Sequence, residues 1–354
     1  MQPQSVSRRF ASRPDQSFGF QDILYAKCDQ VARITLNRPQ HYNAYSTRAL
    51  EELATAFRDA SFDDAVGVIV FTGAGDKAFC TGGDVKEYAA EYVPVPRDYW
   101  KYMALFRAYI EAITNTGKPV IARLNGMAVG GGNESQLACD LTVMAQHAYL
   151  KQVGTQVGSV ACGGSTQWLP IVVGDKRARQ ILMLNEPIPA RQALEWGLVN
   201  WVAPTVRKDG QWLPDASADQ IKQAQRGEGG YRIDLSKLDE MVDDVAHRLL
   251  ETFPECTRYT KQQVSFWKDL AWHSTVRHAQ DWLSLHYSCW EPLEGMSAFG
   301  EKRAPRYRLL RERAAEGRSS ELPWGAPVRQ CAKCGATNLP ADHEFCGACG
   351  QRLS

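Results

Sequence analysis

The chain has 354 residues, of which 44% are hydrophobic, and its formal net charge is +1. This length allows one large domain with an appendage, or two domains. The balanced charge gives no overall field that would recruit nucleic acid or a membrane surface, and no apolar run approaches the roughly 20 residues of a membrane span. We therefore expect neither partner. Residues 1–20 lack the apolar region of a secretory signal, and we expect a flexible tail there.

Strand-like and helix-like patterns alternate through the first part of the chain. Strands are expected at 31–37, 65–72, 119–124 and 141–144, and helices at 46–57, 99–113 and 134–139. The first strand alternates apolar and polar residues, whereas the second is a near-continuous β-branched run, as in a strand covered on both faces. Because the alternation continues to Asn200, we predict an α/β core with crossover helices over residues 21–204.

The composition changes beyond this core. Residues 205–232 are polar and contain several glycines, so we interpret them as an exposed insertion. Residues 233–318 are predicted to be helical, with an amphipathic stretch from Leu235 to Leu249 and a second run over about 258–290 that is rich in aromatic side chains. Residues 319–330 contain two prolines and are predicted to be a linker.

Two glycine-rich segments each follow a strand-like run. They are Gly82-Gly83-Asp84 and Gly130-Gly131-Gly132-Asn133-Glu134. Glycine lets the main chain approach a ligand closely and leaves its amide N–H groups uncovered. Two such groups aimed at one point form an oxyanion hole, which stabilises the charge that develops on a thioester oxygen. We predict that Gly83 and Gly131 supply these donors to a coenzyme A thioester.

An ordered set of motifs identifies the chain as similar to the crotonase (enoyl-CoA hydratase/isomerase) superfamily. The matching segments lie at 37–39, 43–44, 78–84, 118–122, 126–134, 139–140, 163–167 and 193–200. The resemblance implies a spiral of ββα units and a helical region, residues 233–318, that packs on a neighbouring subunit. It also implies homotrimers or hexamers, and it places the oxyanion-hole amides at Gly83 and Gly131.

The departures from the superfamily pattern narrow the expected chemistry. Hydratases of this superfamily use two glutamates; the first matches Glu134, but the second position is Gly154. Segments at 42–45, 79–83, 233–236 and 252–256, together with the insertion, most resemble the 6-oxocyclohex-1-ene-1-carbonyl-CoA hydrolases. Those enzymes typically have Asn where this chain has Asp84. The resemblance implies a substrate site that includes Tyr45, Thr81, Gly82, Gly130, Gly154 and Gly158.

We expect an enzyme that opens an alicyclic β-oxo acyl-CoA by adding water and breaking a C–C bond. Glu134 is the predicted base, because burial in an apolar pocket would raise its pKa toward neutrality. Asp84 is a second carboxylate that could share the acid–base work. The structural alternatives are a helix N-terminal acid for Glu134, a loop cap for Asp84 and core packing for Tyr45.

Two other functions stay open at this point. One is a single-glutamate enoyl-CoA hydratase or isomerase, against which Gly154 counts. The other is a non-catalytic crotonase-like scaffold, against which Glu134 and the two glycine segments count.

The last segment, residues 331–354, carries two Cys-x-x-Cys pairs. These are Cys331 with Cys334 and Cys346 with Cys349, and Gly335 and Gly350 follow the pairs. Four thiolates at this spacing predict a closed, structural zinc site in a zinc ribbon, and a redox pair or a disulfide fits the spacing poorly. The ribbon could bind a protein partner, shape an oligomer or cap the substrate entrance. Unpaired cysteines elsewhere indicate a cytoplasmic protein.

Overall fold

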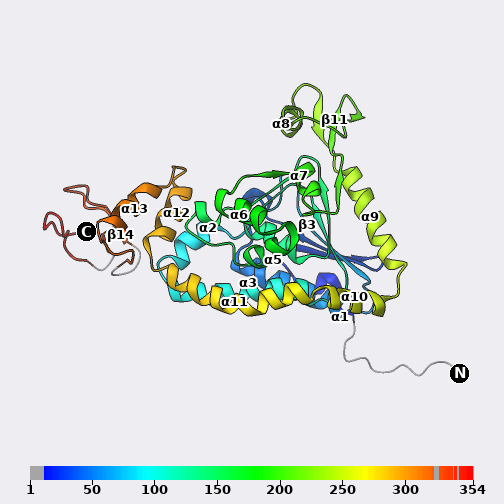
Figure 1. The fold of residues 1–354 in the computed structure, drawn as a ribbon, viewed down its shortest axis with the longest axis horizontal. Coiled ribbons are helices and arrows are strands. Elements are labelled where there is room, and N and C mark those ends of the chain that lie inside the picture. The colour runs from blue at the N-terminus through cyan, green and yellow to red at the C-terminus, as the bar shows by residue number, and fades with distance from the viewer. Residues whose placement is uncertain (1–11, 323–326, 338, 341–342, 354) are drawn as a thin grey trace.

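The computed structural model describes residues 12–322, 327–337, 339–340 and 343–353 (Figure 1). Most of the predicted N-terminal tail, up to residue 11, lies outside this range, as do parts of the predicted linker and zinc ribbon. The remainder of the tail includes a short 3-10 helix, η1 (Asp15–Phe18). Within the described part of the chain, no helix is both long and apolar enough to cross a membrane.

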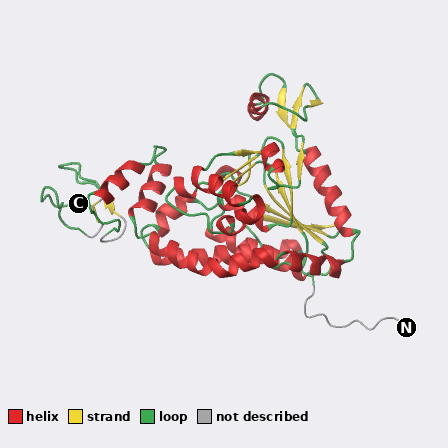
Figure 2. Ribbon diagram, viewed as in Figure 1, coloured by secondary structure: helices red, strands yellow, loops and turns green. Residues whose placement is uncertain are grey.

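The core contains two sheets that are built from consecutive ββα units (Figure 2). The first sheet has the order β1 (Ile23–Cys28), β2 (Val31–Leu36), β3 (Val68–Gly73), β5 (Val120–Leu124), β7 (Leu141–Ala145) and β10 (Trp201–Ala203). The second has the order β4 (Ala78–Cys80), β6 (Met127–Val129), β8 (Tyr149–Lys151) and β9 (Ile188–Pro189). All pairings are parallel except β1 with β2 and β8 with β9. Along the chain, a strand of the first sheet is therefore followed by a strand of the second sheet and then by a helix.

Helices close each turn of this spiral. They are α1 (Thr47–Phe62), α2 (Val85–Glu87), α3 (Pro96–Thr114), α4 (Gly131–Ala138), α5 (Ser165–Val173), α6 (Asp175–Leu184) and α7 (Ala190–Glu195). The predicted cap of α1 is present, since the Ser46 hydroxyl accepts a hydrogen bond from the Ala49 N–H at 3.1 Å. Leu50, Leu53 and Phe57 on its inner face are fully buried. The strand and helix patterns of the sequence thus produce the predicted α/β spiral.

Several predicted boundaries differ by a few residues, such as the start of β3 at Val68 rather than at residue 65, and one of them concerns the glycine-rich segment. The helix α4 begins at Gly131 rather than at Glu134. Gly130 adopts a φ of 55°, and the chain enters the helix immediately after it. The Gly131 N–H is therefore in the first helical turn, where amides have no partner within the helix.

The segment predicted as an insertion forms a small structure that projects from the core (Figure 1). It contains β11 (Val206–Lys208), β12 (Gln211–Trp212), β13 (Tyr231–Ile233) and helix α8 (Ala218–Arg226). At its base, the buried ring of His147 hydrogen-bonds the Thr205 hydroxyl and the Asp76 carbonyl, each at 2.8 Å.

Five helices follow, and three of them pack on elements of the core. They are α9 (Ser236–Leu250), α10 (Pro254–Val264), α11 (Phe266–His286), α12 (Trp290–Gly300) and α13 (Tyr307–Ala315). The predicted run over 258–290 is two helices, because α10 ends at Val264 and α11 begins at Phe266. Helix α11 packs along α3 and α5, and α12 packs on α2 and the π-helical turn η3 (Tyr88–Tyr92). The implied packing of this region on a neighbouring subunit stays a prediction.

Candidate active site

The first glycine segment leaves β4 and passes close to the second. A side chain at Gly82, whose φ is 87°, would place its Cβ only 2.9 Å from the Gly131 nitrogen. Gly83 is fixed against Tyr45, because the Tyr45 N–H donates to the Gly82 carbonyl at 2.9 Å and the Asp84 N–H donates to the Tyr45 carbonyl at 3.0 Å. Glycine at position 82 is thus what allows the two segments to meet.

The second glycine segment is equally constrained. The Gly130 N–H donates to the Lys151 carbonyl at 2.9 Å, and any Cβ at Gly132 would overlap the Cys80 carbonyl. The N–H groups of Gly83 and Gly131 themselves have no acceptor among the described residues. An oxyanion hole needs two such donors aimed at one point, and these two free amides come from adjacent segments.

Both amides belong to residues that line one cavity of about 100 Å³. The predicted site residues in its wall are Tyr45, Thr81, Gly82, Gly83, Gly130, Gly131, Glu134 and Gly154. A larger groove of about 980 Å³ lies beside α10 and α11, but it contains none of the predicted site residues. We place the candidate site in the smaller cavity, because that is where free donors and a buried carboxylate occur together.

Glu134 is the one carboxylate among the described residues that line this cavity, and its side chain is buried. Burial raises its pKa to about 7, and the N–H groups of Ser165 and Gly163 partly oppose this rise. The Ser165 N–H donates to Glu134 Oε1 at 3.2 Å. A carboxyl group with a pKa near neutrality can both accept and return a proton at physiological pH.

Asp84 and Gly158 are not among the lining residues. The Asp84 carboxylate accepts a hydrogen bond from the Lys86 N–H at 3.1 Å and pairs with Arg38 Nη2 at 3.0 Å. These contacts match the alternative role of a loop cap, and a direct role in acid–base chemistry stays a prediction. Gly158, with a φ of 72°, packs against the backbone of Glu291 at the start of α12, where a Cβ would overlap the carbonyl.

Gly154, the position at which the resemblance predicts the second glutamate of the hydratases, lines the wall of the cavity. Its neighbours across the loop are backbone atoms, because a Cβ there would lie 3.0 Å from the Ser159 carbonyl and 3.1 Å from the Ala161 nitrogen. A glutamate at this position would therefore require the 154–161 loop to move.

Sequence reasoning missed several lining residues. Tyr88 comes from η3, Tyr99 and Tyr102 come from α3, and Leu283 and Met296 come from α11 and α12. The spacing of Tyr99, Met103 and Phe106 did indicate an apolar helix face, but this pattern also fits ordinary core packing. No pattern in the sequence indicated that α12 would reach back to the same cavity.

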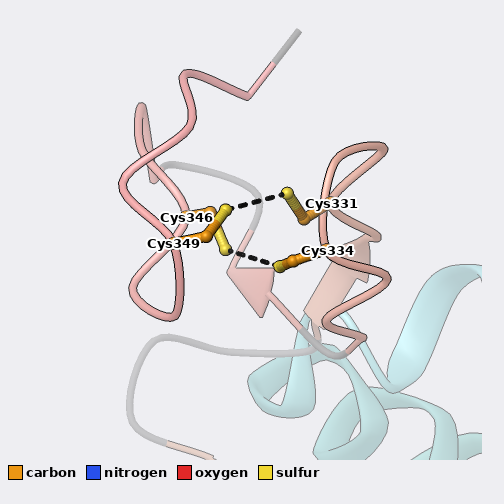
Figure 3. A group of neighbouring side chains, drawn as sticks. All are labelled: Cys331, Cys334, Cys346 and Cys349. Carbon is orange, nitrogen blue, oxygen red and sulfur yellow. Dashed lines mark hydrogen bonds between the residues drawn. The ribbon is translucent and has the colours of Figure 1, made fainter.

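The four C-terminal cysteines converge as predicted (Figure 3). Their sulfur atoms all lie within 4.8 Å of one another, with Cys331 3.7 Å from Cys349 and Cys334 3.6 Å from Cys346. Tetrahedral zinc with Zn–S bonds of about 2.3 Å holds its sulfurs about 3.8 Å apart. The N–H of Gly335 donates to the Cys331 carbonyl, and that of Gly350 to the Cys346 carbonyl, so the two pairs form matching turns. The donor set fits zinc.

Comparison with known proteins identifies the family to which this chain belongs. Residues 27–222 match the enoyl-CoA hydratase/isomerase family, and the chain belongs to that family. An enoyl-CoA hydratase structure from Bacillus anthracis is 29% identical and superposes with a TM-score of 0.58 over 80% of this chain and 98% of that one. The predicted superfamily and fold are confirmed.

Two relatives carry a more specific name. The 6-oxocyclohex-1-ene-1-carbonyl-CoA hydrolase of Geobacter metallireducens is 38% identical over 290 residues, which cover 76% of each chain. The enzyme of the same name from Thauera aromatica is 36% identical over 316 residues, which cover 82% of each chain. The predicted resemblance to these hydrolases is thereby confirmed.

Proposed function

We propose that this enzyme opens the ring of an alicyclic β-oxo acyl-CoA, such as 6-oxocyclohex-1-ene-1-carbonyl-CoA, by adding water. The observation that carries the proposal is the pairing of two free amides, at Gly83 and Gly131, with the buried carboxyl group of Glu134 in one cavity. The name shared by the two curated relatives supports this substrate class, and degradation of aromatic compounds is the metabolic setting we infer.

Ring opening begins at the ketone of a ring whose α-carbon is saturated. Ionised Glu134 takes a proton from water, and the water oxygen forms a bond to the ketone carbon. The resulting alkoxide collapses to a carboxylic acid while the bond to the adjacent α-carbon breaks. The electron pair enters the thioester as an enolate, whose oxygen accepts hydrogen bonds from the N–H groups of Gly83 and Gly131. The proton on Glu134 then returns to the α-carbon, which regenerates the base.

Where a ring double bond is conjugated to the thioester, the same groups hydrate it first. Water adds to the β-carbon while Glu134 takes its proton, the thioester becomes an enolate in the oxyanion hole, and Glu134 then returns the proton to the α-carbon. One carboxylate and one hole therefore serve both steps.

A single-glutamate enoyl-CoA hydratase is the second candidate, because the solved structure from Bacillus anthracis carries that name. Gly154 counts against it, since the cavity wall opposite Glu134 offers no second carboxylate in the described chain. A non-catalytic scaffold is disfavoured, because such a protein has no need to bury a glutamate beside two free amides.

We further propose a cytoplasmic homotrimer or hexamer in which the region 233–318 contributes to the subunit interface. Exposed apolar side chains on and beside α10 and α11 support this assignment, and they include Ile171, Phe253, Val264 and Trp267 around the larger groove. All ten cysteines are free, which suits a reducing compartment.

For the C-terminal segment we propose a structural zinc ion held by Cys331, Cys334, Cys346 and Cys349. With all four positions filled by sulfur, the metal would stabilise the fold of a segment that has little core of its own. The exposed ribbon is available to a protein partner.

The test is to incubate the purified enzyme with cyclic and linear acyl-CoA thioesters and to measure the product masses. A gain of two waters by 6-oxocyclohex-1-ene-1-carbonyl-CoA is the expected result. A gain of one water by linear enoyl-CoA alone would favour the hydratase, and no turnover of any thioester would favour the scaffold.

A further inference from the structure

A group of tyrosine hydroxyls lies in the cavity beside the two glycine segments. Tyr88 begins the π-helical turn η3, in which the Val93 N–H donates to the Tyr88 carbonyl at 2.9 Å. Its hydroxyl forms a hydrogen bond with the hydroxyl of Tyr102 from α3, and the two rings meet edge to face at 5.0 Å. Single π-turns in proteins occur frequently at functional sites.

The hydroxyl of Tyr88 lies directly against Gly83. A Cβ added at position 83 would overlap the Tyr88 hydroxyl and would lie 2.9 Å from that of Tyr102. Gly83 lines this cavity, and its amide N–H has no acceptor among the described residues. A phenol donor and a main-chain donor therefore stand side by side in the same wall.

This arrangement matches the chemistry of a β-oxo thioester, which has two carbonyl groups joined through one carbon. When the thioester oxygen lies at the amide of Gly83, the ring ketone oxygen must lie nearby. Water addition turns that ketone into an alkoxide, and a second donor is needed there. Burial raises the pKa of Tyr88 well above its usual value, so the phenol keeps its proton at neutral pH.

We propose that the Tyr88 hydroxyl donates a hydrogen bond to the ring ketone oxygen, while Tyr102 donates to Tyr88 and orients it. This inference rests on the proposed ring-opening function and adds a second donor site to it. No proton is transferred from Tyr88: the bond between water oxygen and ketone carbon forms, the π electrons move onto the ketone oxygen, and Tyr88 stabilises that charge until the C–C bond breaks.

The pair also gives a reason for substrate selectivity. A linear enoyl-CoA has only the thioester carbonyl, so it leaves one hydroxyl proton of the Tyr88–Tyr102 pair without an acceptor. A buried donor that loses its partner costs about 1–3 kcal/mol. The site should therefore prefer thioesters with a β-oxo group over otherwise identical ones without it.

The experiment compares Tyr88→Phe and Tyr102→Phe with the wild-type enzyme. Tyr92→Phe is the matched control, since the Tyr92 hydroxyl bonds Thr47 in the same region and Tyr92 does not line the cavity. Two readouts are needed: kcat for ring opening of 2-oxocyclohexane-1-carbonyl-CoA, and the ratio of Kd values for cyclohexane-1-carbonyl-CoA and the 2-oxo compound. For the second readout, Glu134→Gln is introduced in every protein to prevent turnover.

Tyr88→Phe should lower kcat about 100-fold, as loss of one preorganised donor does. It should also reduce the preference for the 2-oxo compound roughly tenfold, which corresponds to about 1.4 kcal/mol. Tyr102→Phe should have a smaller effect in the same direction. Tyr92→Phe should match the wild type, and an unchanged Kd for cyclohexane-1-carbonyl-CoA shows that each variant is folded.

An unchanged kcat and an unchanged Kd ratio in Tyr88→Phe would overturn the inference while leaving the ring-opening function standing. If the wild type turns over no cyclic thioester, but prefers the 2-oxo compound and loses that preference in Tyr88→Phe, the proposed function fails and the assignment of Tyr88 as the ketone donor stands. Equal binding of both compounds by the wild type would overturn the inference.

Discussion

Replacing Glu134 by glutamine tests the base and its environment together. The substitution keeps the size of the side chain, and its amide oxygen can still accept the hydrogen bond from the Ser165 N–H. It removes the group that takes a proton from water. Ring opening should therefore fall by at least 100-fold, within the range that general acid–base catalysis contributes, while CoA thioesters should still bind.

The same substitution should change stability in a pH-dependent way. Burial raises the pKa of Glu134 from 4.5 to about 7, and the pKa difference of roughly 2.5 corresponds to roughly 3 kcal/mol. The folded state disfavours the ionised form of Glu134. The free energy of unfolding of the wild type, relative to that of the variant, is therefore highest below the pKa of Glu134 in the unfolded state. This advantage is lost as pH rises through the folded pKa.

Urea denaturation of both proteins at about pH 5 and pH 8.5 measures this difference. Glu134→Gln should be more stable than the wild type by up to roughly 3 kcal/mol at the higher pH and by less than about 1 kcal/mol at the lower one. Glu91→Gln, at an exposed position, is the control and should show no such trend. Equal stabilities at both pH values, with full activity, would refute the assignment of a buried catalytic base.

Four other predictions follow from the same geometry. Wild-type kcat/KM should decline as pH falls below about 7, because Glu134 becomes protonated, and a flat pH profile would argue against it. Gly131→Ala should reduce ring opening about 100-fold, since its Cβ would overlap the Tyr45 hydroxyl in the oxyanion hole, and near-normal kinetics would contradict this. If Asp84 is a loop cap, Asp84→Asn should keep kcat within about threefold, because asparagine also caps helices; a loss of about 100-fold would give it a direct role. Metal analysis should find about one zinc per chain, lost in Cys334→Ser with ring opening retained, and a zinc-free wild type would exclude the ribbon.

The glycine segments could be predicted because their physical cause is local. Strand-like runs followed by glycines indicated where the chain turns, and the loops meet where a Cβ at Gly82 would approach Gly131. The start of α4 could not be predicted in the same way. Glycine is a poor helix former, so Gly131 and Gly132 did not look helical. Glycine is required at position 132 because the backbone of α4 packs against the Cys80 carbonyl of β4, a contact between segments far apart in the sequence.

The tyrosines that line the cavity show a second limit of prediction from the sequence. Tyr88 reaches the cavity through a π-helical turn, which has no period that sequence patterns reveal. Met296 reaches it because α12 folds back over η3, a contact between segments about 200 residues apart. Conversely, the convergence of the four C-terminal cysteines was predictable, since two Cys-x-x-Cys pairs with a following glycine determine their own geometry.

The most direct test of the proposed chemistry is ring opening in water enriched in oxygen-18, with fragmentation of the product to locate the label. Addition of water to the ring ketone predicts oxygen-18 in the newly formed free carboxylate of a linear product that still carries CoA. Label confined to a hydroxyl group on an intact ring, or to a free acid released together with CoA, would contradict C–C bond cleavage by this enzyme.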